Sequence, residues 1–155
     1  MTSTFTQRIL ASDAGLAPLA VRIPIGIIFV AHGAQKLFDW FGGYGLQGTA
    51  QWMDSIGLQP GTLLALLAGG AEFLGGLALL LGLLVRPASA VLAFTMLVAI
   101  FSVHIGKGLF ISEGGYEYAL ALLAVTIALF ISGAGRFSLD RLLLWTQASR
   151  TSAPV

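Results

Sequence analysis

Four long stretches of the chain are almost continuously apolar, and the polar positions gather between them. The stretches cover residues 16–38, 62–84, 88–106 and 116–132. A helix needs about 20 mainly apolar residues to cross the hydrocarbon core of a bilayer, so each stretch predicts a transmembrane α-helix. A membrane β-barrel would show alternating apolar residues instead of continuous runs. The pattern therefore predicts an all-α fold, a four-transmembrane-helix bundle forming one integral membrane domain over residues 1–155.

The connections between these stretches carry residues that end helices or prefer the membrane surface. Arg86 and Pro87 separate the second stretch from the third, and proline is tolerated in a first helical turn. Residues 39–61 form a longer connection that contains Trp40, Phe41, Tyr44 and Trp52, aromatic residues of the kinds favoured at the membrane–water interface. We expect an interfacial segment there, either with a short surface helix over about residues 48–56 or as a plain loop.

The composition fits a chain surrounded by lipid. Hydrophobic residues make up 57%, charged residues 10%, and the mean hydropathy is +0.90. Soluble domains carry about 25% charged residues, and so little charge cannot cover a water-facing surface. The net charge of +1 gives no electrostatic basis for binding nucleic acid. The absence of cysteine excludes disulfides and iron–sulfur ligation by this chain, and the polar first 14 residues predict no removable signal peptide.

The basic residues predict the direction of the spans. The amino terminus, the second connection and the carboxyl terminus share one side, which holds Arg8, Arg86, Arg136, Arg141 and Arg150. The other side holds only Lys36 and Lys107. Because cytoplasmic loops carry the excess of lysine and arginine, we expect both termini in the cytoplasm and the aromatic segment over residues 39–61 on the periplasmic side.

One carboxylate lies near the middle of the second span. A charged side chain at the bilayer centre costs at least ~2.5–3.5 kcal/mol, so Glu72 needs a partner or a proton. Gly69, Glu72 and Gly76 fall on one helical stripe, and small residues mark close helix–helix contact in membranes. We therefore expect Glu72 to face the interior of the bundle. The same glycine-rich span is also a candidate surface for a homo-oligomer.

The first span has a polar face, and the non-cytoplasmic end of the bundle collects ionisable groups. Arg22 can reach toward Glu72 or extend to the cytoplasmic boundary. The groups expected at the other end are His32, Lys36, His104, Lys107, Glu113 and Glu117. The stretch ending at His32 also resembles the stretch ending at His104, which suggests two helical hairpins related by a pseudo-repeat. Chance similarity between apolar segments explains that likeness equally well.

The ordered set of these features resembles the DoxX family of small bacterial inner-membrane proteins over nearly the whole chain. The matching elements are Arg22, His32-Gly33-Ala34-Gln35-Lys36-Leu37, Glu72-Phe73-Leu74-Gly75-Gly76-Leu77, Leu80-Leu81-Gly82, Arg86, Glu117-Tyr118-Ala119 and Gly133-Ala134-Gly135-Arg136-Phe137-Ser138-Leu139-Asp140. The resemblance implies a four-helix fold in the bacterial inner membrane. It also implies a link to oxidoreductase systems, because the family includes proteins similar to a subunit of a thiosulfate–quinone oxidoreductase and others tied to oxidative stress.

Our main functional hypothesis is a site for a quinone, or a similar small redox molecule, inside the bundle. Histidine and a buried carboxylate exchange protons near neutral pH, as quinol oxidation requires. The candidate catalytic residues are His32, Glu72 and His104, and the candidate cofactor-binding residues are Arg22, Phe29, His32, Lys36, Glu72, Phe73, Phe101, His104, Lys107 and Glu117. A purely structural role, in which these groups pair only to hold the helices together, stays open.

Three further hypotheses remain from the sequence. The chain can be a non-catalytic membrane scaffold for redox-enzyme partners, or it can form a small pathway for protons or solutes along Glu72. Haem held by His32 and His104 fits less well, because histidine at a span end is more often an interface residue. No metal-spaced cluster, phosphate loop or nucleophile with an adjoining base is recognisable, so we expect no metal site.

Overall fold

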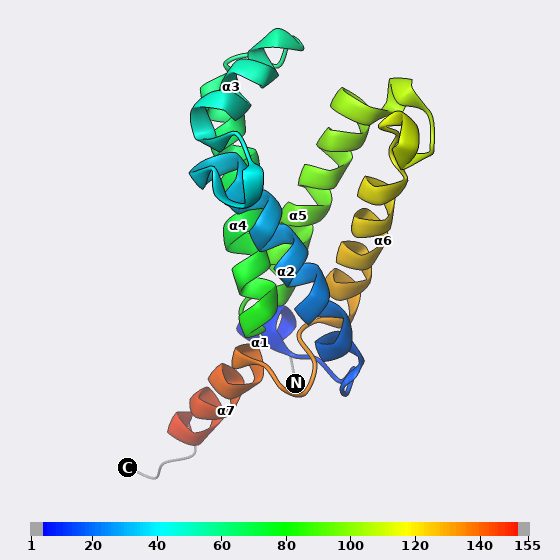
Figure 1. Ribbon diagram of the computed structural model, residues 1–155. Helices are drawn as coiled ribbons and strands as arrows, with labels where there is room; N and C mark the ends of the chain where they lie inside the picture. Colours follow the sequence, from blue (N-terminus) through cyan, green and yellow to red (C-terminus); the bar gives the residue numbers. More distant parts are fainter. Residues whose placement is uncertain (1–4, 152–155) are drawn as a thin grey trace.

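The structure, a computed structural model, describes residues 5–151, and all regular secondary structure over that range is helical (Figure 1). Its long helices are α2 (Ala17–Phe38), α4 (Gly61–Leu81), α5 (Val85–Ala99) and α6 (Glu117–Ser132). The α5 helix continues through a π-helix, η2 (Ile100–His104), and a short turn, η3 (Ile105–Lys107). Three helical segments, Ala17–Phe38, Gly61–Leu81 and Val85–Lys107, are long and apolar enough to cross a membrane, and α6 is a shorter apolar helix of 16 residues.

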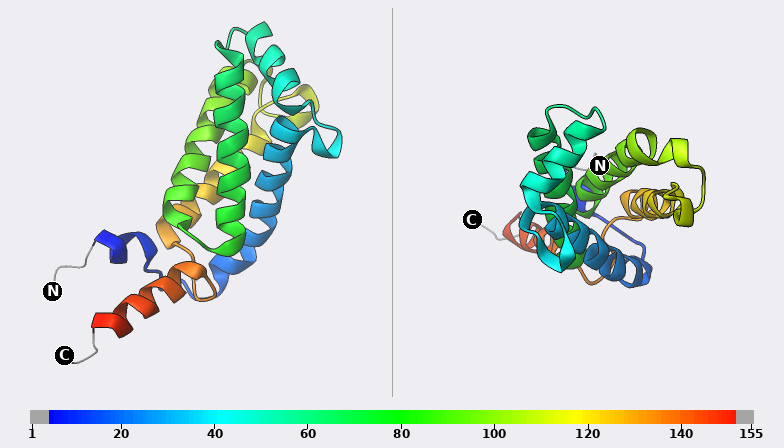
Figure 2. Two further views of the ribbon diagram at one scale, coloured as in Figure 1. Left: turned by 90° about the vertical axis from the view of Figure 1, so that its left-hand side faces the viewer. Right: turned by 45° about the horizontal axis from the view of Figure 1, so that its top comes forward.

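The shorter elements lie at the two ends of these helices. They are α1 (Phe5–Leu10), η1 (Trp40–Gly42), α3 (Gly45–Ser55), η4 (Ile111–Glu113) and α7 (Leu139–Thr151). Of the two alternatives for the connection between the first two spans, the structure contains the short helix, as α3. Two helices that were not among the predicted elements, α1 and α7, lie together at the opposite end of the bundle from α3 (Figures 1 and 2).

The four long helices form two antiparallel pairs, α2 with α4 and α5 with α6, and α4 also contacts α5 (Figure 2). Apolar side chains such as Phe29, Leu79 and Leu92 are buried between them. Large apolar side chains also cover the outside, where Leu74, Phe94 and Ile131 are each about two-thirds exposed. Helices that are apolar on both their inner and outer faces are expected for a bundle immersed in lipid.

Glycines let α2 and α4 touch backbone to backbone. A Cβ atom placed on Gly33 would lie 2.8 Å from the carbonyl oxygen of Gly69, and one placed on Gly76 would lie 2.8 Å from that of Gly26. Real Cβ atoms essentially never approach so closely, so these positions accept only glycine without a shift of a helix. Gly69 and Gly76 of α4 are thus used for packing within the chain, whereas a Cβ on Gly70 would meet nothing within 4 Å.

At the α1/α7 end, Arg22 is 2% exposed and binds main-chain carbonyls. Its guanidinium donates to the carbonyls of Leu79 (2.7 Å) and Leu80 (2.9 Å), in the last turn of α4, and to the carbonyl of Phe137. The last carbonyls of a helix lack intrahelical donors, so Arg22 caps α4. It neither extends to the solvent nor reaches Glu72.

Asp140 in α7 fixes the turn that joins α4 to α5. Its carboxylate accepts hydrogen bonds from the main-chain nitrogens of Leu84 (2.6 Å) and Val85 (3.1 Å). Burial raises the pKa of Asp140 above its ordinary value, and the two backbone donors and the charge of Arg22 oppose that rise. The first turn of α7 is therefore bonded to the turn between two apolar helices.

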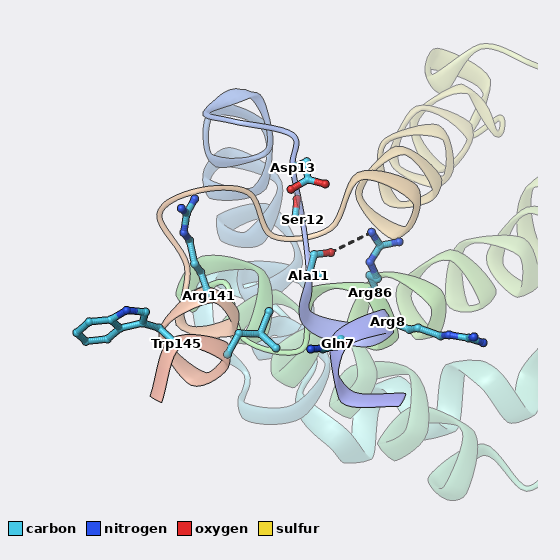
Figure 3. Close-up of a pocket in the computed structure, with 9 residues that line it drawn as sticks. Gln7, Arg8, Ala11, Ser12, Asp13, Arg86, Arg141 and Trp145 are labelled. Carbon is cyan, nitrogen blue, oxygen red and sulfur yellow. Dashed lines mark hydrogen bonds between the residues drawn. The ribbon is translucent and has the colours of Figure 1, made fainter. Parts of the chain in front are cut away.

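Arg86 joins three segments at the same end of the bundle. It donates to the carbonyl of Phe130 in α6 (3.0 Å) and to the carbonyl of Ala11, which follows α1 (3.2 Å; Figure 3). The hydroxyl of Ser12 donates to the carbonyl of Ser132 (2.5 Å). Side-chain bonds to main-chain carbonyls thus hold the segment after α1 against the ends of α5 and α6.

The α2–α4 contact can be tested with two matched glycine variants. Gly33→Ala introduces a methyl group against the backbone of α4, and overpacking of this kind costs about 1–3 kcal/mol. Gly70→Ala, on the same α4 helix, is the control, because a Cβ there meets nothing within 4 Å. We expect the midpoint of thermal unfolding in detergent to fall for Gly33→Ala and to stay or rise for Gly70→Ala. Equal midpoints for the two variants would contradict the close contact.

Candidate functional site

A cavity of about 330 Å³ lies where α2 and α4 diverge from α5 and α6, toward the α3 end of the bundle (Figure 1). We call it the inner cavity. Its polar lining comes from five elements, α2, α4, α5, η2 and α6, and consists of His32, Lys36, Glu72, Thr95, Ser102, His104 and Tyr118. Apolar residues make up the rest of the wall, and Trp52 and Met53 of α3 cover part of it. The inner cavity is therefore an apolar chamber with a few polar groups, the usual character of a small-molecule site.

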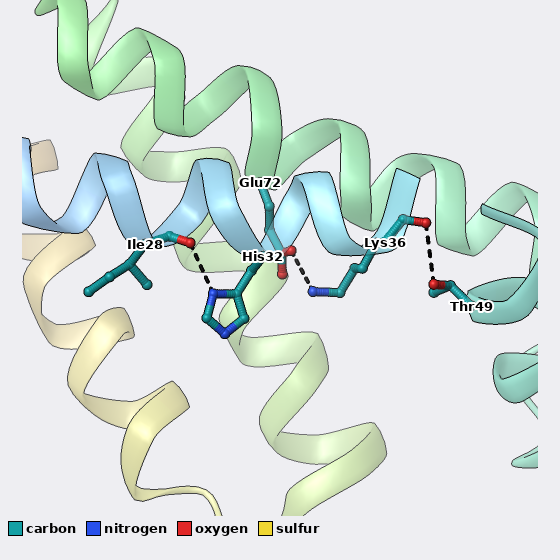
Figure 4. Close-up of polar contacts among 5 residues, drawn as sticks. All are labelled: Ile28, His32, Lys36, Thr49 and Glu72. Carbon is teal, nitrogen blue, oxygen red and sulfur yellow. Dashed lines mark hydrogen bonds and ion pairs between the residues drawn. The ribbon is translucent and has the colours of Figure 1, made fainter. Parts of the chain in front are cut away.

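An ion pair between Lys36 and Glu72 is the main polar contact of this wall. The Lys36 Nζ lies 2.5 Å from Glu72 Oε2, and Figure 4 shows the lysine side chain running from α2 toward the carboxylate. The side chain of Glu72 is 6% exposed and that of Lys36 is 26% exposed. The buried carboxylate thus has a partner, and that partner is Lys36 rather than Arg22.

Each histidine of the inner cavity is held by one ring nitrogen. His32 Nδ1 lies 2.9 Å from the carbonyl oxygen of Ile28, and His104 Nδ1 lies 2.7 Å from that of Gly114 (Figure 4 shows the first). A carbonyl oxygen can only accept, so the Nδ1 atom of each ring must carry the proton and donate it. In the neutral ring, Nε2 is then a hydrogen-bond acceptor. The ring of His32 also lies 5.9 Å, centroid to centroid, from that of Tyr118.

The π-helix at the end of α5 shapes the wall opposite α2. Over Ile100–His104 the helix widens, and Ser102, Val103 and His104 all line the inner cavity. Short π-helical turns inside α-helices are rare overall, and those that occur are often at functional sites. Such a turn redirects side chains relative to a regular helix. Phe101, directly before Ser102 in sequence, is 66% exposed and lies outside the cavity lining.

Of the candidate residues from the sequence, five line the inner cavity: Phe29, His32, Lys36, Glu72 and His104. The others lie elsewhere. Phe73 packs edge-on against Phe38, with ring centroids 5.2 Å apart. Glu117 accepts a hydrogen bond from the main-chain nitrogen of Ile111 (2.7 Å), Lys107 is exposed, and Arg22 and Phe101 lie as described above.

Three residues that were not among the predicted site residues also line the inner cavity: Trp52, Met53 and Tyr118. The aromatic character of the α3 segment pointed to the membrane surface, and only its folding back over the bundle brings Trp52 to the cavity. Among the described residues, no group of three or more histidine, aspartate or glutamate side chains is placed to hold a metal ion.

The fold and the cavity define a multi-pass helical membrane protein with a largely apolar chamber, lined by a few polar groups, toward one end. The family model for DoxX matches residues 17–105, and the chain belongs to the DoxX family. This match covers α2 through α5 and so includes Glu72, Lys36 and both histidines.

Curated relatives extend over most of the chain. A Bacillus subtilis protein named "Putative oxidoreductase CatD" is 31% identical over 125 residues, covering 81% of this chain and 85% of the relative. The Escherichia coli inner membrane protein YqjF is 35% identical, covering 81% and 90%. A Mycobacterium tuberculosis membrane protein, Rv3486, is 32% identical, covering 88% and 86%. No solved structure matches the chain. The family and its relatives place the protein in the inner membrane as a multi-pass protein.

The Lys36–Glu72 pair can be tested by a double-mutant cycle. Lys36→Met leaves a buried carboxylate without its partner, which costs about 1–3 kcal/mol or more of folding free energy. Glu72→Gln removes the charge that needs pairing, so the double variant should be more stable than Lys36→Met alone. Residues in direct contact show coupling energies of about 0.5–3 kcal/mol. Unfolding in detergent measures each variant, and Lys107→Met, at an exposed lysine, is the control. If the change in unfolding free energy of the double variant equals the sum of the changes of the two single variants, the ion pair contributes nothing to stability.

Proposed function

We propose that the inner cavity binds a quinone, or a similar small redox molecule, and that the chain serves a membrane oxidoreductase or oxidative-stress system. One observation carries the proposal: two histidines with accepting Nε2 atoms and a buried ion pair line an otherwise apolar chamber of about 330 Å³. Ligand sites typically measure about 300–1,000 Å³, so this volume suits one small ring system. The name of the Bacillus subtilis relative supports a redox role.

The lining matches the chemistry of both forms of a quinone. Quinone oxygens accept hydrogen bonds, and the Lys36 ammonium and Tyr118 hydroxyl are donors in the wall. Quinol hydroxyls donate, and the histidine Nε2 atoms accept. Oxidation of a quinol to a quinone releases two protons and two electrons. His32 and His104 each take up one of the two protons through Nε2, and the two electrons pass to a redox-enzyme partner in the membrane.

The proposal includes the path of the chain through the membrane. The 16 residues of α6 rise about 24 Å, less than the roughly 30 Å of a bilayer core, but the helix packs antiparallel along α5. We take α6 as a fourth span, which returns the chain to the end that holds α1 and α7. Arg8, Arg86, Arg136 and Arg141 belong to that end, so it faces the cytoplasm and α3 faces the periplasm.

Quinone binding is tested by thermal unfolding of the purified protein with a short-chain ubiquinone or menaquinone. A ligand that binds only the folded state stabilises it, by about 2.7 kcal/mol at 100 times its dissociation constant. We expect the wild type to be stabilised, and His32→Gln and His104→Gln to need about tenfold more quinone for the same stabilisation, a change of about 1.4 kcal/mol in binding. Glu117→Gln is the control, since Glu117 does not line the cavity. No stabilisation of the wild type by either quinone would refute the proposal.

The topology is tested by labelling single cysteines in intact cells with a membrane-impermeant maleimide, because the native chain has none. Ser55→Cys, at the exposed end of α3, should be labelled from outside, and Thr146→Cys, exposed on α7, only after the membrane is broken. If α6 did not cross the membrane, both cysteines would react from the same side.

A further inference from the structure

A second cavity adjoins the inner cavity at the α3 end of the bundle. Its volume is about 690 Å³, it is lined by the end of α2, η1 and α3, and we call it the outer cavity. Apart from glycines, its lining consists of Gln35, Lys36, Tyr44, Thr49, Gln51 and Trp52. Lys36 is the charged member of this set, and the others mostly offer neutral hydrogen-bonding groups. Such a surface suits water and small polar molecules rather than lipid chains.

Two residues, Lys36 and Trp52, line both cavities. They therefore form the wall between the outer cavity and the inner cavity. Lys36 lies across this wall: its carbonyl oxygen accepts a hydrogen bond from the Thr49 hydroxyl of α3 (3.3 Å), while its ammonium group reaches Glu72 inside the bundle (Figure 4). Trp52 is 43% exposed and belongs to α3, which covers the inner cavity.

We propose that Lys36 and Trp52 form a gate, through which water, protons and other small water-soluble species pass between the α3 side and the inner cavity. The Lys36–Glu72 ion pair holds the gate shut. Opening it leaves a 6%-exposed carboxylate without its cation, which is costly in a poorly hydrated site. Lysine is suited to such a part, because its compact, strongly hydrated ammonium group moves on a flexible four-carbon stem. The outer cavity offers that group a polar space to move into.

The contacts at the two ends of α2 indicate from which side polar molecules reach the inner cavity. At the other end, Arg22 is buried and bonded to main-chain carbonyls of α4 and of the segment before α7. Polar access to the inner cavity therefore runs toward α3. A ligand that gives Glu72 a new hydrogen-bond donor would release Lys36 and open the route. This last point rests on the proposed function, whereas the gate itself rests on the shared lining residues.

The gate can be measured with a single cysteine at the inner cavity, since the native chain has none. Ala119 lines the inner cavity and is 7% exposed, so Ala119→Cys reports access to it. The probe is a positively charged, membrane-impermeant methanethiosulfonate, added to the full chain in lipid nanodiscs. Gln51→Cys, in the outer cavity, reports access to that cavity alone.

We expect Trp52→Ala to raise the labelling rate of Ala119→Cys about tenfold, the change given by an opening cost lower by about 1.4 kcal/mol. Lys36→Met should raise it in the same direction. The matched controls are Trp40→Ala, an exposed tryptophan, and Lys107→Met, because neither residue lines either cavity. Both controls should leave the rate unchanged, and Gln51→Cys should react at one rate in every background.

An unchanged rate in Trp52→Ala and Lys36→Met, or an equal increase in Trp40→Ala, would overturn the gate. Trp52→Leu, which keeps an apolar side chain, replaces Trp52→Ala if that variant loses its thermal unfolding transition. The labelling needs no quinone. If the labelling rates change as expected but the protein binds no quinone, only the proposed function is contradicted. If the protein binds quinone but the labelling rates do not respond to the gate variants, only the gate is contradicted.

Discussion

The backbone contact between α2 and α4 is the constraint on which the site depends. Gly33 packs against the backbone of Gly69 and Phe73 at this contact, and a methyl group on Gly33 would push the helices apart. Glu72, one turn beyond Gly69, is thereby held within reach of Lys36, at 2.5 Å. A lipid-facing carboxylate would cost several kcal/mol. The glycines make it possible to keep this carboxylate inside the membrane by giving it a cation from the adjacent helix.

The two ends of the bundle use polar groups in different ways. At the α1/α7 end, Arg22 and Asp140 are almost wholly buried and bind main-chain atoms at the end of α4 and the start of α5. At the α3 end the helices diverge, and the polar side chains of α2, α4 and α5 line cavities instead of capping helices. The proposed binding and access therefore use the α3 end, whereas side-chain bonds to the main chain hold the elements of the α1/α7 end together.

Much of this could be predicted from the sequence, because lipid imposes simple requirements. Apolar runs of about 20 residues indicate helices of spanning length, and the cost of a charge in lipid indicates that Glu72 faces inward. The placement of Phe101 outside the cavity lining could not be predicted, since a regular helical wheel does not hold across the π-helix at Ile100–His104. The hydrogen bond between Arg22 and the carbonyl of Phe137 could not be predicted either, because these residues are far apart in sequence and meet only in the folded bundle.

The central claim is that the inner cavity is a ligand site and not a packing defect. A high-resolution structure of the protein purified in native lipids tests it most directly. We predict flat, non-protein density between His32 and His104, within hydrogen-bonding distance of an Nε2 atom, together with a co-purified quinone-like molecule detected by mass spectrometry. A cavity closed by Met53 and the neighbouring apolar side chains, with the Lys36–Glu72 pair intact and no bound molecule, would contradict the claim.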